Sequence, residues 1–533
     1  MPRLHVQTFG CQMNTHDSER IFDVLEPHGY GAEPEAALAD VMVVNTCSVR
    51  EKAEHKLFSM LGRLRDWKEA RPGRQIAVAG CVASHQGSAI IRRAPWVDVV
   101  FGPDRIHELP VLLAEIEQGA PPRIAVAFDY DAPTFLSPVV DAAPTKASGP
   151  TAFVTVMKGC DERCTFCIVP YTRGSERYRP AADIVSECKH WVRRGAREIT
   201  LLGQTVNSWH EPVTLTSQDN DCTSLDIASQ MRSVPRMQGS SKAPSHFAQL
   251  LRLIAEEVPD LLRLRYTSPH PRHITEALLD AYHDLDLLPD HVHLPVQSGS
   301  NRMLRRMLRR YTRAQYLESI ASLRLARPNM TFSTDLIVGF PGETDADFAE
   351  TLSLVEEVEF TSVYAFKYSP RPHTPALNFE DLAVAEDVKE ARLAKLFEVA
   401  DRVQARHLAG LVGSEVDVLI ESRGKSNEGL WQGRSQRNEI VHLSAPSSSE
   451  PSASALNAAV LAEGALVRAR VESAGARSVK AKPLVLLASP PAPVRLSEAG
   501  EGQAATQPAA AHANAPEGKR RLPLTTAIAG GLP

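Results

Sequence analysis

Three cysteines follow one another at the spacing C-x3-C-x2-C, at Cys160, Cys164 and Cys167. They come directly after a short apolar run, Ala152–Met157, which we expect to be a β-strand. Three thiolates on one loop can hold three irons of a 4Fe-4S cluster and leave the fourth iron for a small molecule. Structural zinc is the alternative, but it normally has four protein ligands. The next cysteine, Cys188, lies too far along the chain to be an obvious fourth ligand.

A second set of three cysteines, Cys11, Cys47 and Cys81, is spread along the N-terminal part of the chain. Each of them comes just after the carboxyl end of an expected strand. In an open parallel sheet those ends lie along one edge, where ligands bind. Each cysteine alone could be a small buried hydrophobe, but the threefold coincidence favours a second three-cysteine cluster with an open iron. The expected strands are Arg3–Thr8, Val41–Asn45 and Gln75–Ala79.

The pattern of expected strands and helices around these cysteines indicates an α/β protein with three folded parts. Residues 1–125 alternate strands and helices, such as Ser18–Glu26 and Arg50–Glu69, and predict a doubly wound parallel sheet. Residues 126–150 read as a linker. Residues 151–410 contain six βα units and predict a partial (β/α)6 barrel with an insertion at 211–245. Residues 411–486 predict a small β-barrel, interrupted by the low-complexity run Ser444–Ser454, and we expect residues 487–533 to be a disordered tail.

The expected strands and helices of these parts can be given by residue. In the central part the strands are Ala152–Met157, Glu198–Leu202, Arg263–Thr267, His291–Val296, Thr331–Val338 and Ser362–Tyr368. Its expected helices are Phe247–Val258, Ile274–Tyr282, Arg313–Leu325 and Asp345–Val358. In the β-barrel part the strands are Glu415–Glu421, Glu439–Leu443 and Leu466–Val471.

The composition fits a soluble protein of several domains. The formal net charge of −5 over 533 residues excludes binding to nucleic acid by bulk electrostatics, so any RNA contact must come from local patches. The chain contains no run of the ~20 apolar residues that cross a bilayer, and its first strand leaves no room for a signal peptide. We therefore expect a cytoplasmic protein, whose reducing surroundings disfavour disulfides. The remaining cysteines, Cys188 and Cys222, need no role in the chemistry, and a monomer is the default expectation.

The loop at Cys160 resembles the defining motif of the radical S-adenosylmethionine superfamily, C-x3-C-x-aromatic-C, with Phe166 as the aromatic residue. The resemblance implies that the amino and carboxylate groups of S-adenosylmethionine chelate the open iron. It also implies that an electron from the cluster cleaves the sulfonium and releases a 5′-deoxyadenosyl radical. The superfamily's partial barrel agrees with the six βα units.

With both cysteine sets placed, the chain from residue 3 to about 410 resembles the methylthiotransferases, and among them the tRNA 2-methylthio-N6-isopentenyladenosine synthases (the MiaB family). The resemblance is carried by TFGCQMN at Thr8–Asn14, NTCSVRE at Asn45–Glu51, GCV at Gly80–Val82, KGCDERCTFCIVPYTRG at Lys158–Gly174, LLGQTVNSW at Leu201–Trp209, LPVQSGSNRML at Leu294–Leu304, STDLIVGFPGET at Ser333–Thr344 and YSPRPHTPA at Tyr368–Ala376. The part at 413–485 is similar, more weakly, to the RNA-binding TRAM domain of that family.

The resemblance implies replacement of the adenine C2–H of N6-isopentenyladenosine, at position 37 beside the tRNA anticodon, by C2–S–CH3. One S-adenosylmethionine would methylate a sulfur on the cluster of Cys11, Cys47 and Cys81, and a second would yield the radical at the other cluster. An unknown electron donor protein is implied. Two sister groups modify threonylcarbamoyladenosine of tRNA or an aspartate of a ribosomal protein, and a zinc-dependent RNA-binding protein is the non-enzymatic alternative.

Two further sets of residues are candidates for binding. Residues that we expect near S-adenosylmethionine, by their place at strand ends on the active face, are Phe166, Gln204, Ser298, Asp335 and Gly339; turn or packing roles are the alternative. The segment Asn301–Arg313, read as one helix, has an apolar face and a basic face. That face is able to meet phosphates or simply to be solvated, and its candidate RNA-binding residues are Arg302, Arg305, Arg306, Arg309 and Arg310.

Overall fold

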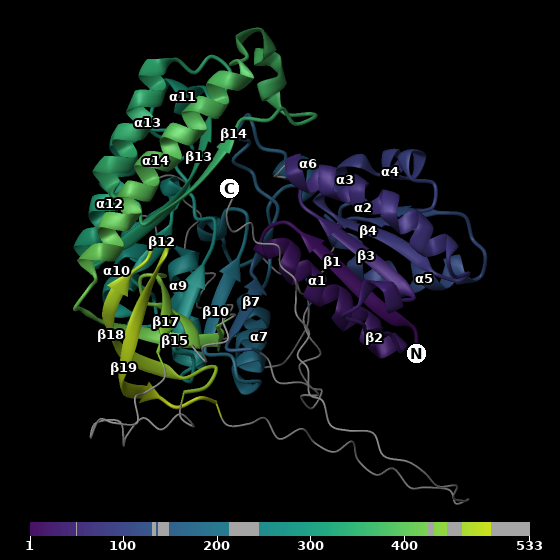
Figure 1. Cartoon of the computed structure of the whole chain (residues 1–533), viewed down its shortest axis with the longest axis horizontal. Coiled ribbons are helices and arrows are strands. Elements are labelled where there is room, and N and C mark those ends of the chain that lie inside the picture. The colour runs from purple at the N-terminus through teal and green to yellow at the C-terminus, as the bar shows by residue number, and fades with distance from the viewer. Residues whose placement is uncertain are drawn as a thin grey trace, which may run out of the picture. The chain divides into compact units, whose positions relative to one another are not determined.

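The computed structural model describes residues 1–48, 51–130, 135–136, 149–212, 245–424, 431–444 and 461–491 (Figure 1). Within these ranges the chain forms two compact units, the first inside residues 1–147 and the second inside residues 148–493. Cys222, most of the 211–245 insertion, nearly all of the run at 444–454 and nearly all of the predicted tail lie outside the described residues. None of the described helices is both long enough and apolar enough to cross a membrane.

The first unit is a six-stranded parallel sheet in the order β2-β1-β3-β4-β5-β6 (Figure 1). Its strands are β1 Arg3–Phe9, β2 Gly31–Ala32, β3 Val41–Thr46, β4 Gln75–Gly80, β5 Val99–Phe101 and β6 Arg123–Ala125. Its helices are α1 Gln12–Leu25, α2 Glu51–Glu69, α3 Cys81–Gln86, α4 Ser88–Arg93 and α5 Leu109–Glu117, with 3₁₀ turns at Glu26–His28, Ala36–Leu38 and Pro103–Glu108. The doubly wound parallel sheet predicted from the sequence is therefore confirmed.

Helices cover both faces of this sheet, and the two central strands are buried along their whole length. On β3, Met42 and Val44 pack with α2, α3 and α4, whereas Val41 and Val43 pack with α1 and α5. Successive side chains of a strand point to opposite faces, so a strand buried on both faces reads as an unbroken apolar run. This is why the sequence reveals these strands so clearly.

The second unit contains six parallel strands in two three-stranded sheets, ordered β11-β10-β7 and β12-β13-β14. These strands are β7 Thr151–Thr155, β10 Glu198–Leu202, β11 Arg263–Tyr266, β12 His291–His293, β13 Thr331–Val338 and β14 Ser362–Lys367. The helices are α6 Val169–Thr172, α7 Ala181–Arg193, α9 His246–Glu257, α10 Glu276–Asp284, α11 Asn301–Arg306, α12 Arg313–Ala326, α13 Asp345–Val358 and α14 Glu386–Gly410. Short 3₁₀ turns lie at Val206–Ser208, Pro271–His273 and Pro375–Leu382. One core joins strands and helices, and Figure 1 shows α12, α13 and α14 along one side of β13 and β14.

A closed five-stranded β-barrel, in the order β15-β16-β17-β19-β18, follows α14. Its strands are β15 Glu415–Arg423, β16 Trp431–Ser435, β17 Ile440–Leu443, β18 Leu466–Ala474 and β19 Ser478–Ala488. The fold class predicted from the sequence is thus confirmed in its three parts.

The β-barrel is docked onto the amino ends of the parallel strands. Arg263 and Arg265, near the start of β11, donate hydrogen bonds to the carbonyl oxygens of Arg434 (3.2 Å) and Ser435 (3.0 Å). The Glu198 carboxylate, at the start of β10, pairs with both guanidinium groups at 3.1 and 3.0 Å. The buried carboxylate holds the two guanidinium groups in place, and their hydrogen bonds to the carbonyl oxygens of β16 fix the barrel to this end of the strands.

Several element boundaries differ from the sequence-based expectations. Helix α1 begins at Gln12 rather than Ser18, because Asn14 and its polar neighbours are buried and carry no apolar periodicity. The expected strand Ala152–Met157 divides into β7 and a two-residue strand, β8 Met157–Lys158, which pairs with β9 Arg177–Tyr178. The expectation of one helix over Asn301–Arg313 is wrong. Helix α11 ends at Arg306, and Leu308 and Arg310 have positive φ angles of 59° and 58°.

Candidate cysteine-ligated metal centres

In the first unit, Cys11, Cys47 and Cys81 lie at the carboxyl edge of three adjacent strands, β1, β3 and β4. In the pairing of these strands, Phe9 of β1 lies beside Thr46 of β3, and Thr46 lies beside Gly80 of β4. The three strands therefore end at the same height in the sheet, just before the three cysteines. A Cβ on Gly10 would lie 2.7 Å from the Cys47 Cβ. The chain before Cys11 therefore passes directly against Cys47, and the structure brings the three predicted cysteines to one edge.

A network of buried amides and hydroxyls holds this edge together. The Cys11 thiol donates to Asn14 Oδ1 (3.3 Å), and Asn14 Nδ2 donates to Asn45 Oδ1 (3.1 Å). The Asn45 amide also donates to the Asn14 carbonyl oxygen (2.8 Å) and to Ser18 Oγ (2.9 Å). A Cβ on Gly80 would lie 2.4 Å from Asn45 Oδ1, so only glycine fits there. Outer contacts of this kind orient metal ligands. Our reading of the sequence assigned them no role, although both asparagines stand in the motifs that carry the resemblance.

In the second unit, the loop with Cys160, Cys164 and Cys167 crosses the carboxyl ends of the parallel strands. The Cys160 Sγ lies 3.0 Å from Thr205 Oγ1, just after β10. Thr165, inside the loop, donates from its backbone nitrogen to the Met307 carbonyl oxygen and accepts from Ala376 N. The loop is thus tied to segments that follow β10, β12 and β14, which is the face where barrel enzymes bind their ligands.

Two thiols of this loop, Cys160 and Cys167, are poorly suited to carry charge without a metal. Burial raises the pKa of the Cys160 thiol to about 12, and the hydrogen bond from Thr205 opposes this only in part. Burial also raises the pKa of Cys167, and the neighbouring Cys164 and Cys160 raise it further through like-charge repulsion. Metal binding removes thiol protons. Cys160 and Cys167 therefore keep their protons until a cation arrives, and together with the neighbouring Cys164 they form a donor set suited to an iron–sulfur cluster.

Glu162, between the first two cysteines of the loop, ties the loop to the segment after β11. Its carboxylate accepts hydrogen bonds from Arg272 Nη1 and His273 Nε2, both at 3.1 Å. The hydrogen bond from His273 and the charges of His270 and Arg272 outweigh burial and lower the pKa of Glu162 to about 2. Glu162, His270 and His273 are close enough to hold a cation. However, the Arg272 guanidinium already supplies positive charge there, so we interpret the cluster as a clamp on the loop.

We expect Glu162→Gln to destabilise the protein by about 2 kcal/mol, because a buried charge-assisted network loses its acceptor. Asp161→Asn is the matched control, since Asp161 is the preceding residue and its side chain is 53% exposed. That control should change stability by less than about 0.5 kcal/mol. Urea unfolding of the full chain measures both, and equal stabilities for the two variants would contradict the clamp.

The residues predicted to lie near S-adenosylmethionine have different surroundings. Both side-chain polar atoms of Gln204 are buried and, within the described part of the chain, lack a hydrogen-bond partner, as a ligand-binding amide would. Phe166 and Ile337 both pack against a small apolar cluster that includes Met303 and Phe340. Asp335 lies on the same face of β13 as Ile337.

The other two predicted residues have structural partners. The Ser298 hydroxyl accepts from Ser300 N (3.2 Å) and lies 3.4 Å from Thr351 Oγ1, contacts that favour a turn role. Gly339 has φ +68°, and a Cβ there would lie 2.2 Å from Lys389 Cγ, so glycine is required by the turn. The Asp335 carboxylate also has a structural partner, His293 Nε2 at 3.6 Å, so Gln204 and Phe166 are the residues whose surroundings leave a binding role open.

The predicted basic face of Asn301–Arg313 is not formed as one surface. Arg302 pairs with the Asp347 carboxylate, and Arg306 Nη1 donates to the Pro341 carbonyl oxygen (2.9 Å). Arg309 is buried, so its expected place on a surface is wrong; the positive φ angles that follow α11 turn it inward. Arg305 and Arg310 are exposed.

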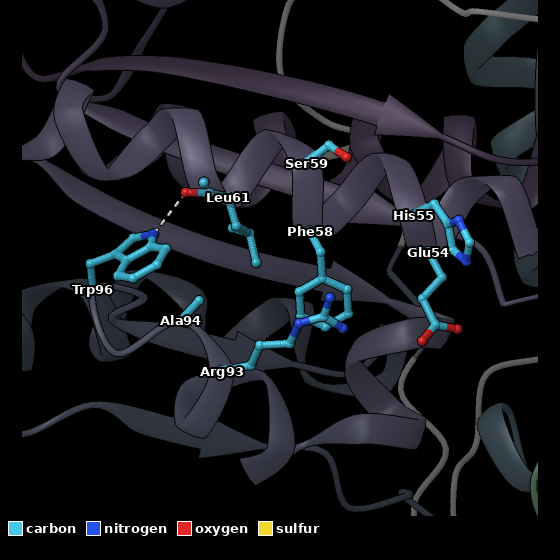
Figure 2. Close-up of a pocket in the computed structure, with 9 residues that line it drawn as sticks. Glu54, His55, Phe58, Ser59, Leu61, Arg93, Ala94 and Trp96 are labelled. Atoms are coloured by element: carbon cyan, nitrogen blue, oxygen red, sulfur yellow. Dashed lines mark hydrogen bonds between the residues drawn. The ribbon is translucent and has the colours of Figure 1, made fainter.

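A surface depression of about 460 Å³ lies in the first unit, between α2 and the segment around α4 (Figure 2). Figure 2 shows the Arg93 guanidinium over the Phe58 ring, 3.8 Å from its centroid, and Trp96 Nε1 donating to the Leu61 carbonyl oxygen. None of the six cysteines lines the depression.

Comparison with known proteins gives two family matches along the chain. Residues 3–102 match the family described as "Uncharacterized protein family UPF0004", and residues 154–355 match the radical SAM superfamily. A tRNA-2-methylthio-N(6)-dimethylallyladenosine synthase of Sorangium cellulosum is 53% identical, covering 83% of this chain and 88% of that protein. The Agrobacterium fabrum protein of the same name is 43% identical, covering 83% and 92%. Among solved structures, the radical S-adenosylmethionine methyltransferase TsrM of Kitasatospora setae has a TM-score of 0.46 at 15% identity, covering 70% of this chain and 77% of that one.

The fold and the C-x3-C-x2-C loop, with the superfamily match over the same residues, define a radical S-adenosylmethionine enzyme. A 4Fe-4S cluster and S-adenosylmethionine are the cofactors of that class. The chain belongs to the tRNA-2-methylthio-N(6)-dimethylallyladenosine synthase family, at 40–53% identity over most of its length.

Proposed function

We propose that this protein transfers a methylthio group to C2 of N6-isopentenyladenosine at position 37 of tRNA. The observation that carries the proposal is the presence of two three-cysteine sets, each at the carboxyl ends of parallel strands in its own α/β unit. Family membership supports the substrate, because the relatives are synthases of this modified nucleoside. The threonylcarbamoyladenosine and ribosomal-protein activities of the sister groups are alternatives that the experiment below distinguishes.

We assign one 4Fe-4S cluster to each cysteine set. Cys160, Cys164 and Cys167 would hold the cluster that binds S-adenosylmethionine, and Cys11, Cys47 and Cys81 would hold an auxiliary cluster. Radical chemistry at the adenine C2 would come from the first of these centres with its S-adenosylmethionine. The second would carry the sulfur that is methylated, whether that sulfur belongs to the cluster or is an exogenous sulfide. We also infer a monomeric cytoplasmic protein that receives its electrons from a donor protein.

The chain's own residues would bind and orient S-adenosylmethionine and the target nucleoside, and would exclude water from them. The orphaned amide of Gln204 offers a donor and an acceptor to a polar ligand, and Phe166 offers an apolar wall. The Glu162 clamp and the Thr165 backbone contacts hold the loop still, so that the reacting atoms meet in one geometry. A loop nucleoside of tRNA can be splayed into such a site at small expense because it is not paired.

The decisive experiment examines tRNA nucleosides by mass spectrometry after deletion of the gene and again after its return on a plasmid. We expect 2-methylthio-N6-isopentenyladenosine to disappear and N6-isopentenyladenosine to accumulate in the deletion strain, with reversal on complementation. Persistence of the methylthiolated nucleoside would remove this substrate. Anaerobic purification should give about eight irons per chain, as two 4Fe-4S clusters require, whereas zinc without sulfide would favour the RNA-binding alternative.

Contact with tRNA is expected from the exposed arginines that follow β12. Arg305→Ala should weaken tRNA binding and reduce the slope of log K against log salt by about 0.7–0.9, the value for one lost phosphate contact. Arg302→Ala is the matched control, because that guanidinium is held by Asp347 and the Gly342 carbonyl oxygen. It should lower stability by about 1 kcal/mol and leave the salt slope unchanged. Equal slopes for all three proteins would exclude Arg305 as a phosphate contact.

A further inference from the structure

Arg309 is a buried cation whose three guanidinium nitrogens all have defined partners. Nε donates to Tyr311 Oη (3.0 Å), Nη2 donates to the Pro295 carbonyl oxygen (3.0 Å), and Nη1 donates to Cys164 Sγ (3.3 Å). The Tyr311 hydroxyl in turn donates to the Val296 carbonyl oxygen (2.9 Å). The guanidinium is therefore held by three hydrogen bonds, one of which is to the sulfur of one particular cysteine.

Arg309 is a buried positive charge that has no carboxylate partner in the described part of the chain. The ion pairs of this region join Glu162 to Arg272 and Arg310, and in the part of the chain that the structure describes none joins a carboxylate to Arg309. A buried charge without a counter-charge costs several kcal/mol. The other two partners of Arg309, the Tyr311 hydroxyl and the Pro295 carbonyl oxygen, are neutral groups. The Cys164 sulfur, 3.3 Å from Nη1, is therefore the contact that would carry negative charge as a cluster ligand.

We propose that Arg309 is a positioning residue that balances the charge of the Cys160–Cys164–Cys167 cluster and raises its reduction potential through the Cys164 thiolate. The inference rests on the proposed function, which makes Cys164 a cluster ligand. Reduction adds one electron, and so one negative charge, to the cluster and its thiolates. A fixed cation at hydrogen-bonding distance from a ligand sulfur stabilises the reduced state more than the oxidised state, and hydrogen bonds to the sulfurs are a known determinant of cluster potential.

The test is a reduction titration of the cluster in the full chain, followed by electron paramagnetic resonance. The Cys11→Ala/Cys47→Ala/Cys81→Ala background leaves only the Cys160 loop to hold a cluster, so the signal has one source. In this background Arg309→Met should shift the reduction equilibrium about tenfold toward the oxidised state, a fall of ~59 mV for a one-electron couple. Arg309→Lys, which retains a cation, should recover most of that shift.

Arg310→Met is the matched control, because Arg310 is the next residue, is exposed, and approaches Glu162 rather than a thiolate. It should leave the potential unchanged. An Arg309→Met protein with full iron and the parental potential would overturn the proposal, as would equal shifts for Met and Lys. If Arg309→Met does not fold, Arg309→Gln takes its place, and an unshifted potential in it overturns the proposal equally. A background protein without iron or sulfide would instead refute the cluster assignment, so the two failures are distinguishable.

Discussion

Cys47→Ala should abolish methylthiolation while 5′-deoxyadenosine formation from S-adenosylmethionine continues. Cys47 lies in the first compact unit, and the C-x3-C-x2-C loop lies in the second, with its own core. Removing one of three ligands should prevent the first unit from holding its cluster, because even changes outside the ligand shell cost metal sites about 10–100-fold. We therefore expect methylthiolated product to fall by roughly 100-fold or more, and iron to fall from about eight to about four per chain.

The matched control is Cys188→Ala, which removes a buried sulfur that belongs to neither set and packs in the core of the second unit. It should retain all iron and both activities. Liquid chromatography of 5′-deoxyadenosine and mass spectrometry of tRNA nucleosides measure the two reactions in one sample. If Cys47→Ala lost S-adenosylmethionine cleavage while remaining folded, the division of labour between the two cysteine sets would be wrong.

Gly159→Ala should prevent the C-x3-C-x2-C loop from forming and so eliminate S-adenosylmethionine cleavage. Gly159 has φ +79°, and a Cβ there would lie 2.0 Å from the Ser175 carbonyl oxygen. The contacted oxygen belongs to the backbone, so it cannot move away without displacing the chain that also accepts the Cys160 N–H at Gly174. The loss of iron should be confined to this loop, with about four irons remaining per chain.

Gly73→Ala is the matched control for Gly159→Ala, because it introduces the backbone strain of a positive φ angle without a steric clash. Gly73 has φ +86° and nothing within 4 Å of a Cβ, so alanine there meets the same unfavourable φ without a contact. The left-handed conformation costs about 1–2 kcal/mol for a residue with a side chain, and this variant should keep its full iron and activity. A Gly159→Ala protein with eight irons and normal cleavage would show that the loop tolerates a different path.

The sequence predicted the strands well, and with them the positions of the cysteines at the strand ends, because the signals of the strands are strong. β3 is buried on both faces and reads as an unbroken apolar run, and the cysteines follow the strand ends directly. Helix α1 was predicted to start too late because Asn14 and its neighbours are polar residues buried around Cys11. The inward turn at Arg309 follows from positive φ angles at Leu308 and Arg310, non-glycine residues that carry no local sign of it. Only the three-dimensional contacts identify Arg309 as a partner of Cys164.

The position of the β-barrel sets the length of RNA that could contact the barrel and the cysteine loop at the same time. The barrel is bonded to the starts of β11 and β13, whereas the cysteine loop crosses their far ends. The eight residues of β13 separate these levels by about 25 Å at ~3.3 Å per residue. If the barrel contacts the RNA as well, a substrate engaged at both places must span about this distance. We then expect minimal anticodon hairpins to bind progressively better as their stem is lengthened.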